Sequence, residues 1–94
     1  MIFESVHNYH EGAIFRQIRE QAPLFPGLAT KPGLLADVAC VALNRMTPRY
    51  VRNNVDMAFY MDDSELANQR AGVKSAVDYA FAFVQLRSAQ DDSR

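Results

Sequence analysis

The sequence is poor in the features that build disulfide scaffolds, zinc sites and membrane spans. Its single cysteine, Cys40, cannot form an intramolecular disulfide and leaves a cysteine-based zinc site short of ligands. No apolar run approaches the roughly 18 residues of a membrane-spanning helix, and no basic start leads into an apolar core and a small-residue cleavage site. We therefore expect a cytoplasmic protein that is neither exported nor inserted in a membrane.

An excess of charge of one sign is also missing. Ten basic and eleven acidic side chains give a formal charge of −1, so the chain is not built to wrap a nucleic-acid backbone, and any anion must meet a local basic patch. Apolar residues make up 49% of the chain and charged residues 22%, a composition typical of folded proteins. We interpret residues 1–94 as one small domain, whose modest core would gain from self-association.

Apolar residues recur at helical spacing in three segments. The spacing predicts helices over residues 3–21, over residues 34 to 45 or 46, and from Asp62 or Asp63 to about residue 88. The second helix is apolar on most faces, which predicts that it is buried in the centre of the domain. The prolines and glycines of residues 22–33 predict a loop, and the polar residues after about 88 predict a disordered tail.

The predicted fold class is mainly α, a small helical domain of three to four helices with at most a short β-strand. The strand-compatible run is Val55–Tyr60, which could instead be a helical turn. Along the last helix, a second row of apolar residues that includes Phe81 and Phe83 makes the apolar face wider than a stripe of about 100°. One chain can hardly cover such a face, so we expect a homodimer.

Catalytic and metal-binding patterns are weak. His7 and His10 lie three residues apart beside Glu11, but no third or fourth ligand is near, which favours surface or hydrogen-bonding roles over a metal site. Cys40 lies among apolar residues in mid-helix, which predicts a small buried hydrophobe and not a nucleophile. No two titratable groups are spaced so that one could activate the other, so we expect neither an enzyme nor a cofactor.

The segment between the second and third helices carries a cluster of arginines. Arg45, Arg49 and Arg52 fall within eight residues around Pro48, with no acid among them. Guanidinium groups can grip a phosphate, stack on a flat base or pair with the edge of guanine. Asp56 could accept hydrogen bonds from a guanine or pair with an arginine. Composition alone favours solvated arginines with local ion pairs, and leaves the ligand site as the alternative.

Three stretches resemble the family of the late competence development protein ComFB. They are "VHNYHE" (residues 6–11), "DVACVALNRMTPRYVRNNVDMAFY" (residues 37–60) and the closing amphipathic helix, in an order that matches over about residues 2–86. The most specific piece is "ALNR-x-x-P-x-Y", and Asn8 is a second point of agreement. This chain has Thr47 where many members have a first proline of two, and it lacks the zinc-binding cysteines of one branch apart from Cys40, so zinc is not carried over.

The resemblance implies a small helical homodimer that acts as a receptor for a cyclic dinucleotide, cyclic di-GMP or cyclic di-AMP. Such a receptor controls motility, pili or competence through a downstream protein that the sequence does not identify. A ligand with two phosphates and two flat bases suits arginines, which serve as charge partner and as stacking plane. The alternative is a structural or adaptor homodimer that binds a partner protein and no small ligand. The ligand-binding residues that we expect are Asn8, Asn44, Arg45, Arg49, Tyr50, Arg52 and Asp56.

Overall fold

The computed structural model describes residues 2–55, 57 and 61–92 of the chain. The domain is mainly α, as the sequence predicts, with one small antiparallel pair of strands. In chain order the elements are β1 (His7–Asn8), α1 (His10–Gln21), the 3-10 turn η1 (Ala22–Leu24), α2 (Pro26–Ala29), α3 (Pro32–Asn44), β2 (Tyr50–Val51) and α5 (Asp63–Asp92).

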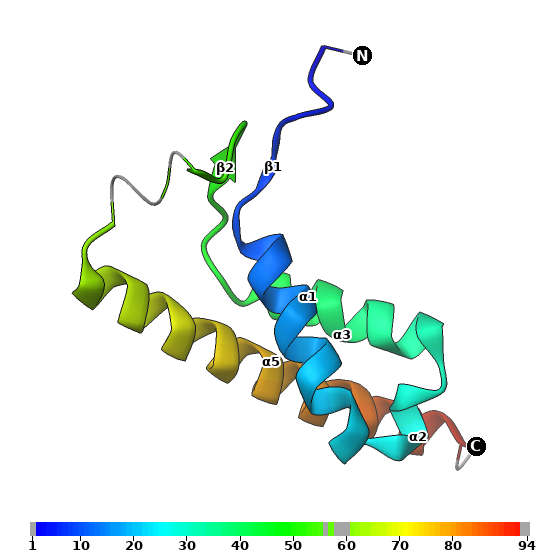
Figure 1. The fold of residues 1–94 in the computed structure, drawn as a ribbon. Helices are drawn as coiled ribbons and strands as arrows, with labels where there is room; N and C mark the ends of the chain where they lie inside the picture. The colour runs from blue at the N-terminus through cyan, green and yellow to red at the C-terminus, as the bar shows by residue number, and fades with distance from the viewer. Residues whose placement is uncertain (1, 56, 58–60, 93–94) are drawn as a thin grey trace.

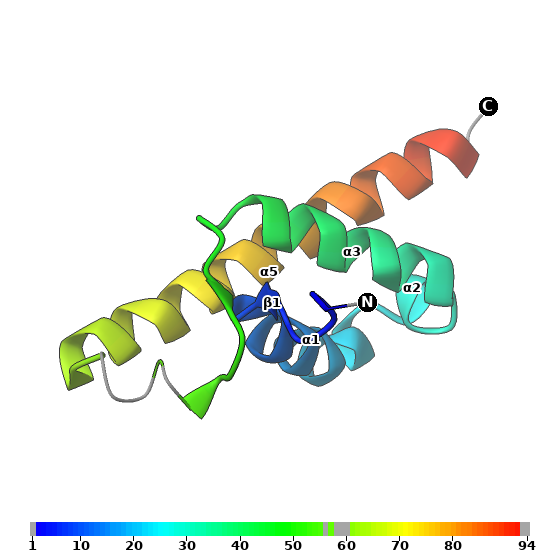
Figure 2. The same cartoon turned by 90° about the horizontal axis from the view of Figure 1, so that it is seen from above.

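Three helices form the body of the domain. The long helix α5 runs along one side, and α1 and α3 both pack against it and against each other (Figure 1). Viewed from above, α5 extends beyond the other helices at both of its ends (Figure 2). The strands β1 and β2 lie together beyond the first turn of α1, away from the helical core.

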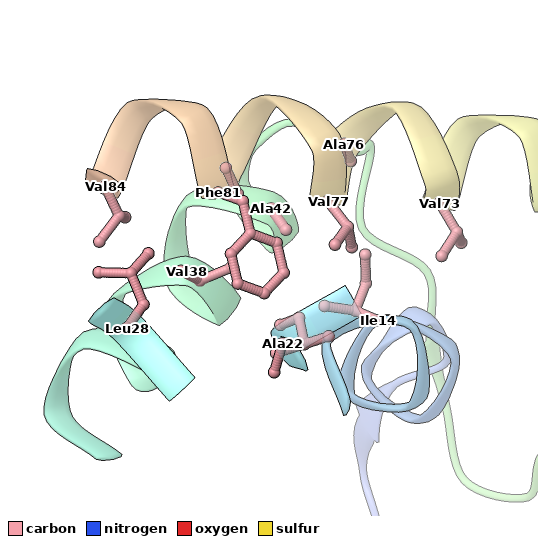
Figure 3. Packing of buried hydrophobic residues seen from close by; sticks show 12 residues of the cluster. Ile14, Ala22, Leu28, Val38, Ala42, Val73, Ala76, Val77, Phe81 and Val84 are labelled. Carbon is pink, nitrogen blue, oxygen red and sulfur yellow. The ribbon is translucent and has the colours of Figure 1, made fainter. Parts of the chain in front are cut away.

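The core lies where α1, α2 and α3 meet the middle of α5 (Figure 3). Phe81 is fully buried, and its ring stacks on Phe25 with centroids 4.4 Å apart and planes 7° from parallel. Ile14 of α1 and Val38 of α3 are also fully buried against this helix. Helices of the same chain therefore cover the part of the wide α5 face around Phe81, whereas Phe83 of its second apolar row is 39% exposed.

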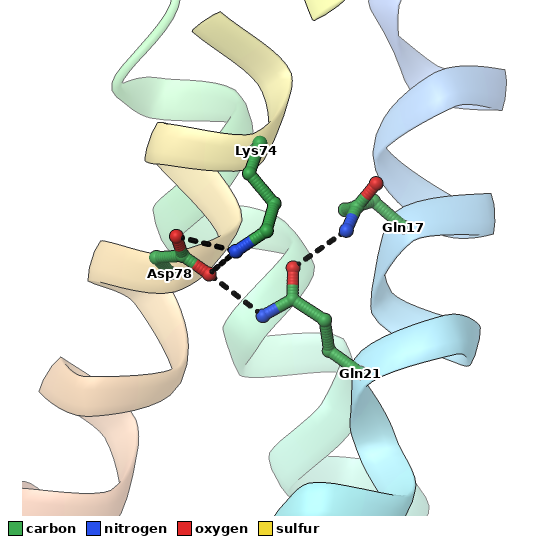
Figure 4. A network of polar contacts seen from close by, with 4 residues as sticks. All are labelled: Gln17, Gln21, Lys74 and Asp78. Carbon is green, nitrogen blue, oxygen red and sulfur yellow. Dashed lines mark hydrogen bonds and ion pairs between the residues drawn. The ribbon is translucent and has the colours of Figure 1, made fainter. Parts of the chain in front are cut away.

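A chain of polar side chains ties the end of α1 to α5 (Figure 4). The amide of Gln21 donates to Asp78 over 2.8 Å, and its oxygen accepts from Gln17 over 2.7 Å. Lys74 pairs with the same carboxylate at 2.6 Å. The hydrogen bond from Lys74 and, to a lesser extent, that from Gln21 hold the pKa of Asp78 below its usual value.

The helix ends differ from the prediction in three places. The first helix begins at His10 and not at residue 3, because residues 7–8 pair with β2 instead. Helix α3 begins at Pro32, since proline suits the first turn, where its missing N–H is not needed. Helix α5 continues to Asp92, past the expected end near residue 88. Within the predicted loop, η1 and α2 each begin with a proline in the first turn.

Three side chains are not where the apolar pattern placed them. Cys40 is exposed. The buried stripe of α3 passes through Val38 and Ala42, and Cys40, two residues from each, faces the opposite side of the helix. Leu43 is only partly buried, and Leu24 is 75% exposed. The prediction of a central helix buried on most faces is therefore wrong, since α3 buries one face and leaves another open.

The described residues of the predicted strand-or-turn segment do not form a strand. Val55 and Met57 are helical, and the Met57 N–H donates to the Asn54 carbonyl over 3.2 Å. The other residues of Val55–Tyr60, Asp56 among them, lie outside the described residues. The strands of the domain are instead at His7–Asn8 and Tyr50–Val51, with His7 opposite Val51.

Candidate functional site

Residues 45–54, which we call the connector, lead from α3 through β2. They carry all three clustered arginines and lie against the start of the chain (Figure 1). The β1–β2 pair sets their register, and the Tyr9 N–H donates to the Arg49 carbonyl over 2.6 Å. The connector is thus fixed to a segment about forty positions earlier in the sequence.

Asn8 holds the connector and α1 together. This side chain is buried, and its Oδ1 accepts from the backbone N–H of His10 over 3.2 Å and from that of Arg49 over 3.1 Å. One oxygen therefore satisfies a donor at the start of a helix and a donor on an irregular segment, both of which would otherwise lack a partner. The observed contacts of Asn8 are those of a residue that positions the connector.

His7 makes a second link between the same two segments. Its Nε2 lies 2.6 Å from Asn54 Oδ1, and its Nδ1 lies 2.8 Å from the Ser5 carbonyl oxygen. Both ring nitrogens face oxygen acceptors, and only the protonated imidazole can donate to both. The carbonyl of Ser5 and then the amide of Asn54 accordingly raise the pKa of His7 above its usual value.

The three arginines of the connector point to different surroundings. The Arg45 guanidinium lies over the ring of Tyr79 on α5, with its Cζ 3.9 Å from the ring centroid. Arg49 lines a hollow beside His10, and Arg52 is exposed next to β2. Asn44 ends α3 and is exposed, as is Tyr50 on β2. The structure therefore does not gather the predicted ligand residues of the described chain around a single point.

The hollow beside Arg49, which we call the connector hollow, has a volume of about 400 Å³. It opens between the connector, the start of α1 and the first half of α5. Its lining combines two methionines, one arginine, one glutamate and several amides: His10, Met46, Thr47, Arg49, Met61, Glu65, Asn68, Gln69 and Gly72. Such a mixture can hold a flat apolar body and recognise polar groups on its edge.

Two buried polar atoms in the wall of this hollow have no hydrogen-bond partner within the described part of the chain. They are His10 Nδ1 and Gln69 Oε1, which come from different helices. Burial, and then the positive charge of Arg49, lower the pKa of His10 below its usual value. His10 is therefore neutral at pH 7, and the charged groups that line the hollow are Arg49 and Glu65.

The connector hollow joins the three sequence stretches that carry the resemblance. His10 comes from the first stretch, Thr47 and Arg49 come from the second, and Glu65 comes from the closing helix. The family model described as "Late competence development protein ComFB" matches residues 7–88, which is most of the chain. The chain belongs to the ComFB family. The match begins at β1, so it includes the strand and the asparagine that hold the connector.

No curated protein and no solved structure is significantly similar to this ComFB-family chain. Family membership links the chain to competence development, and the ComFB family is not known as an enzyme family. Among the described residues, no helix is long and apolar enough to cross a membrane. The same residues contain no cluster of three or more His, Cys, Asp or Glu side chains that could hold a metal.

Sequence reasoning missed His10, Gln69 and Tyr79 in this ComFB-family chain. His10 was noticed only as half of a weak metal pair, although its place in "VHNYHE" ties it to the family motif. Gln69 carries no signal, because an amide in the middle of an amphipathic helix is ordinary. Tyr79 carries no such signal either, because its position under the Arg45 guanidinium depends on how the end of α3 lies against α5.

Proposed function

We propose that the chain is a non-enzymatic cytoplasmic receptor for a cyclic dinucleotide, cyclic di-GMP or cyclic di-AMP, with the connector hollow as the centre of its site. The observation that carries this proposal is Arg49, whose guanidinium lines the hollow and makes no hydrogen bond or ion pair with the described residues. A volume of about 400 Å³ falls within the range of about 300–1,000 Å³ that is usual for small-molecule pockets.

The lining suits the parts of such a ligand. Arg49 can pair with a phosphate through a two-pronged hydrogen bond. Met46 and Met61 offer polarizable apolar surface to a flat base. Glu65 can accept from the N–H groups on the edge of a guanine. The neutral ring of His10 adds no charge that would compete with Arg49 for the phosphate.

The other expected ligand residues take places around this centre in the proposal. Arg45 and Tyr79 form a stacked pair whose outer faces could receive a second base, because each flat group can stack on both sides. Asn44, Tyr50 and Arg52 are exposed on or next to the connector, where a ligand larger than the hollow would reach. Asn8 acts by positioning Arg49, and Asp56 is retained from the sequence pattern alone.

Calorimetric titration with cyclic di-GMP and cyclic di-AMP tests the proposal. Arg49→Ala should weaken binding by about 1.5–3 kcal/mol, the range for a charge-assisted hydrogen bond. Arg49→Lys should restore little, since lysine keeps the charge but loses the planar fork. The matched control is Arg87→Ala near the end of α5, which lines a different hollow and should bind like the parent. Absence of binding heat with both nucleotides would refute the proposal.

The second part of the proposal is a homodimer. Its interface is not the wide apolar face of α5 but a face formed by α1 and α3. Between α1 and α3 lies a groove of about 450 Å³, which we call the α1–α3 groove. Its lining is almost entirely apolar: Phe15, Ile18, Arg19, Leu35, Ala36, Ala39, Cys40 and Leu43. Exposed apolar surface of this kind marks interaction sites. We infer that a second copy of the chain packs on it about a two-fold axis.

This groove also favours a second candidate function, an adaptor that binds a partner protein and no small ligand. Light scattering over a concentration series measures whether the chain is a monomer or a dimer. Ala36→Glu in the groove should abolish the dimer, whereas Ala67→Glu, an equally exposed change near the start of α5, should leave it intact. A monomer at all concentrations would exclude the dimer. A dimer that gave no binding heat with either nucleotide would favour the adaptor homodimer.

A further inference from the structure

A second polar hollow lies on the other flank of α1, between this helix and the first half of α5. We call it the α1–α5 hollow, and its volume is about 430 Å³. It is lined by Tyr9, Gly12, Ala13, Arg16, Asn54, Val55, Leu66, Gln69 and Arg70. No arginine of the connector belongs to this lining, although Asn54 of the connector does and Gln69 lines both hollows, so the α1–α5 hollow is a neighbour of the proposed nucleotide site with its own pair of arginines.

Two arginines from different helices face this space. Arg16 comes from α1 and Arg70 from α5, and both also line a smaller neighbouring hollow, which Glu20 lines as well. Neither guanidinium makes a hydrogen bond, an ion pair or a ring contact with the described residues. Because both arginines line one hollow, an anion placed between them would meet two positive charges at once.

The described lining of this hollow is positively charged. The chain as a whole carries a formal charge of −1, yet the described residues that line the α1–α5 hollow include two cations and no acid. The larger hollow between α3 and the end of α5, of about 600 Å³, instead balances Lys31 and Arg87 with Asp37 and Asp91. Of these two hollows, only the α1–α5 hollow has a net positive charge on its described lining residues.

The remaining lining residues suit a body attached to the anion. Tyr9 and Leu66 are partly buried and Val55 is exposed, so they offer apolar surface beside the arginines. The Gln69 oxygen is buried without a partner among the described residues. At Gly12, an added Cβ would meet nothing within 4 Å, so this glycine leaves open space at the wall of the hollow.

We propose that the α1–α5 hollow is a second binding site, which takes the phosphate of a small phosphorylated molecule between Arg16 and Arg70. A phosphate has enough acceptor oxygens to bind two guanidinium groups at once. The organic part of a phosphate ester would then lie against Tyr9, Val55 and Leu66. Binding would link α1 to α5 and stabilise the half of α5 that extends beyond the core.

Amide NMR spectra recorded with three probes test this site. The probes are inorganic phosphate, adenosine 5′-monophosphate and adenosine. We expect the first two to shift the amides of Ala13, Arg16, Gln69 and Arg70 at millimolar concentration, with the ester binding more tightly because of its organic part. Adenosine alone should not shift them. If free phosphate binds as tightly as the ester, the inorganic ion is the ligand. If neither probe shifts these amides, the proposal is wrong.

Matched variants give the proposal a sharper test. Arg16→Gln and Arg70→Gln should each weaken binding about tenfold or more, because each removes one charged pair of hydrogen bonds. Arg87→Gln makes the same change of charge near the end of α5, outside this hollow, and should alter binding less than twofold. An equal loss in all three variants would mean unspecific attraction and would overturn the site.

Two further variants separate shape from charge and this site from the connector. Gly12→Leu should block the hollow, whereas Gly33→Leu, on a helix with equally open space, should not affect binding. Arg49→Gln should leave phosphate binding unchanged, since Arg49 does not line this hollow. Loss of phosphate binding in Arg49→Gln would show that the two hollows are one site and would refute an independent one. Circular dichroism should show that every variant remains folded.

Discussion

Replacing Asn8 tests whether one buried amide holds the connector in place. Asn8→Ala removes the oxygen that accepts from the His10 and Arg49 N–H groups at 3.2 and 3.1 Å. Each hydrogen bond contributes about 0.5–1.5 kcal/mol net, so the loss should be about 1–3 kcal/mol in the free energy of unfolding. The upper half of this range applies if both donors stay buried after the change, because an unpaired buried donor costs most.

Urea denaturation of Asn8→Ala and Asn8→Asp, followed by circular dichroism, measures this loss. Aspartate keeps an acceptor at the same position and places a negative charge at the start of α1, where the helix dipole favours it, so Asn8→Asp should lose less than half as much stability as Asn8→Ala. Hydrogen exchange should show faster exchange at the Tyr9 and Arg49 amides in the alanine variant. Equal stability of Asn8→Ala and the parent, with unchanged exchange at these two amides, would refute the structural role of Asn8.

Three further predictions concern the core and the titrating groups. Phe81→Ala should lower the free energy of unfolding by about 3–5 kcal/mol, as for other fully buried phenylalanines. Phe83 is 39% exposed, so Phe83→Ala should cost clearly less in the same thermal or urea unfolding measurement. Because the pKa of His7 is raised in the folded state, its contribution to stability should be complete at acidic pH and fade as the pH rises through that pKa. The stability difference between the parent and His7→Ala should therefore be larger at pH 5 than at pH 8. Because the pKa of Asp78 is lowered in the folded state, its contribution to stability should be present at neutral pH and fade as the pH falls through that pKa. The parent should therefore be more stable than Asp78→Asn at pH 7, and the two should converge in acid. Equal stability at both pH values would contradict the prediction.

The three main helices could be predicted because their signal is local. Apolar residues one helical turn apart mark a buried stripe, and the stripe of α5 through Val73, Val77 and Phe81 is buried in the structure. The same signal could not tell which apolar face of α3 is covered, because that depends on where α1 and α5 cross it. Cys40 and Leu43 were therefore misplaced, although the helix that carries them was not.

The strand pair gave no signal in the sequence. Each strand has two residues, too few to show an alternation of apolar and polar side chains, and the partners are about forty positions apart. The role of Asn8 depends on that pairing, and so does the position of Arg49. The arginine cluster itself was visible from spacing, but its division between Tyr79 and the connector hollow follows from tertiary packing that no local pattern encodes.

The attachment of the connector to the first residues of the domain affects how shortened or tagged versions of the chain would behave. A version trimmed to begin at α1 would keep every helix that contributes to the core, and its circular dichroism spectrum would report a well-folded protein. It would nevertheless lack β1 and Asn8, and with them the hydrogen bonds that place Arg49. Helical content is therefore a poor proxy for an intact connector. A loss of ligand binding after changes at the amino terminus would not mean that those residues touch the ligand.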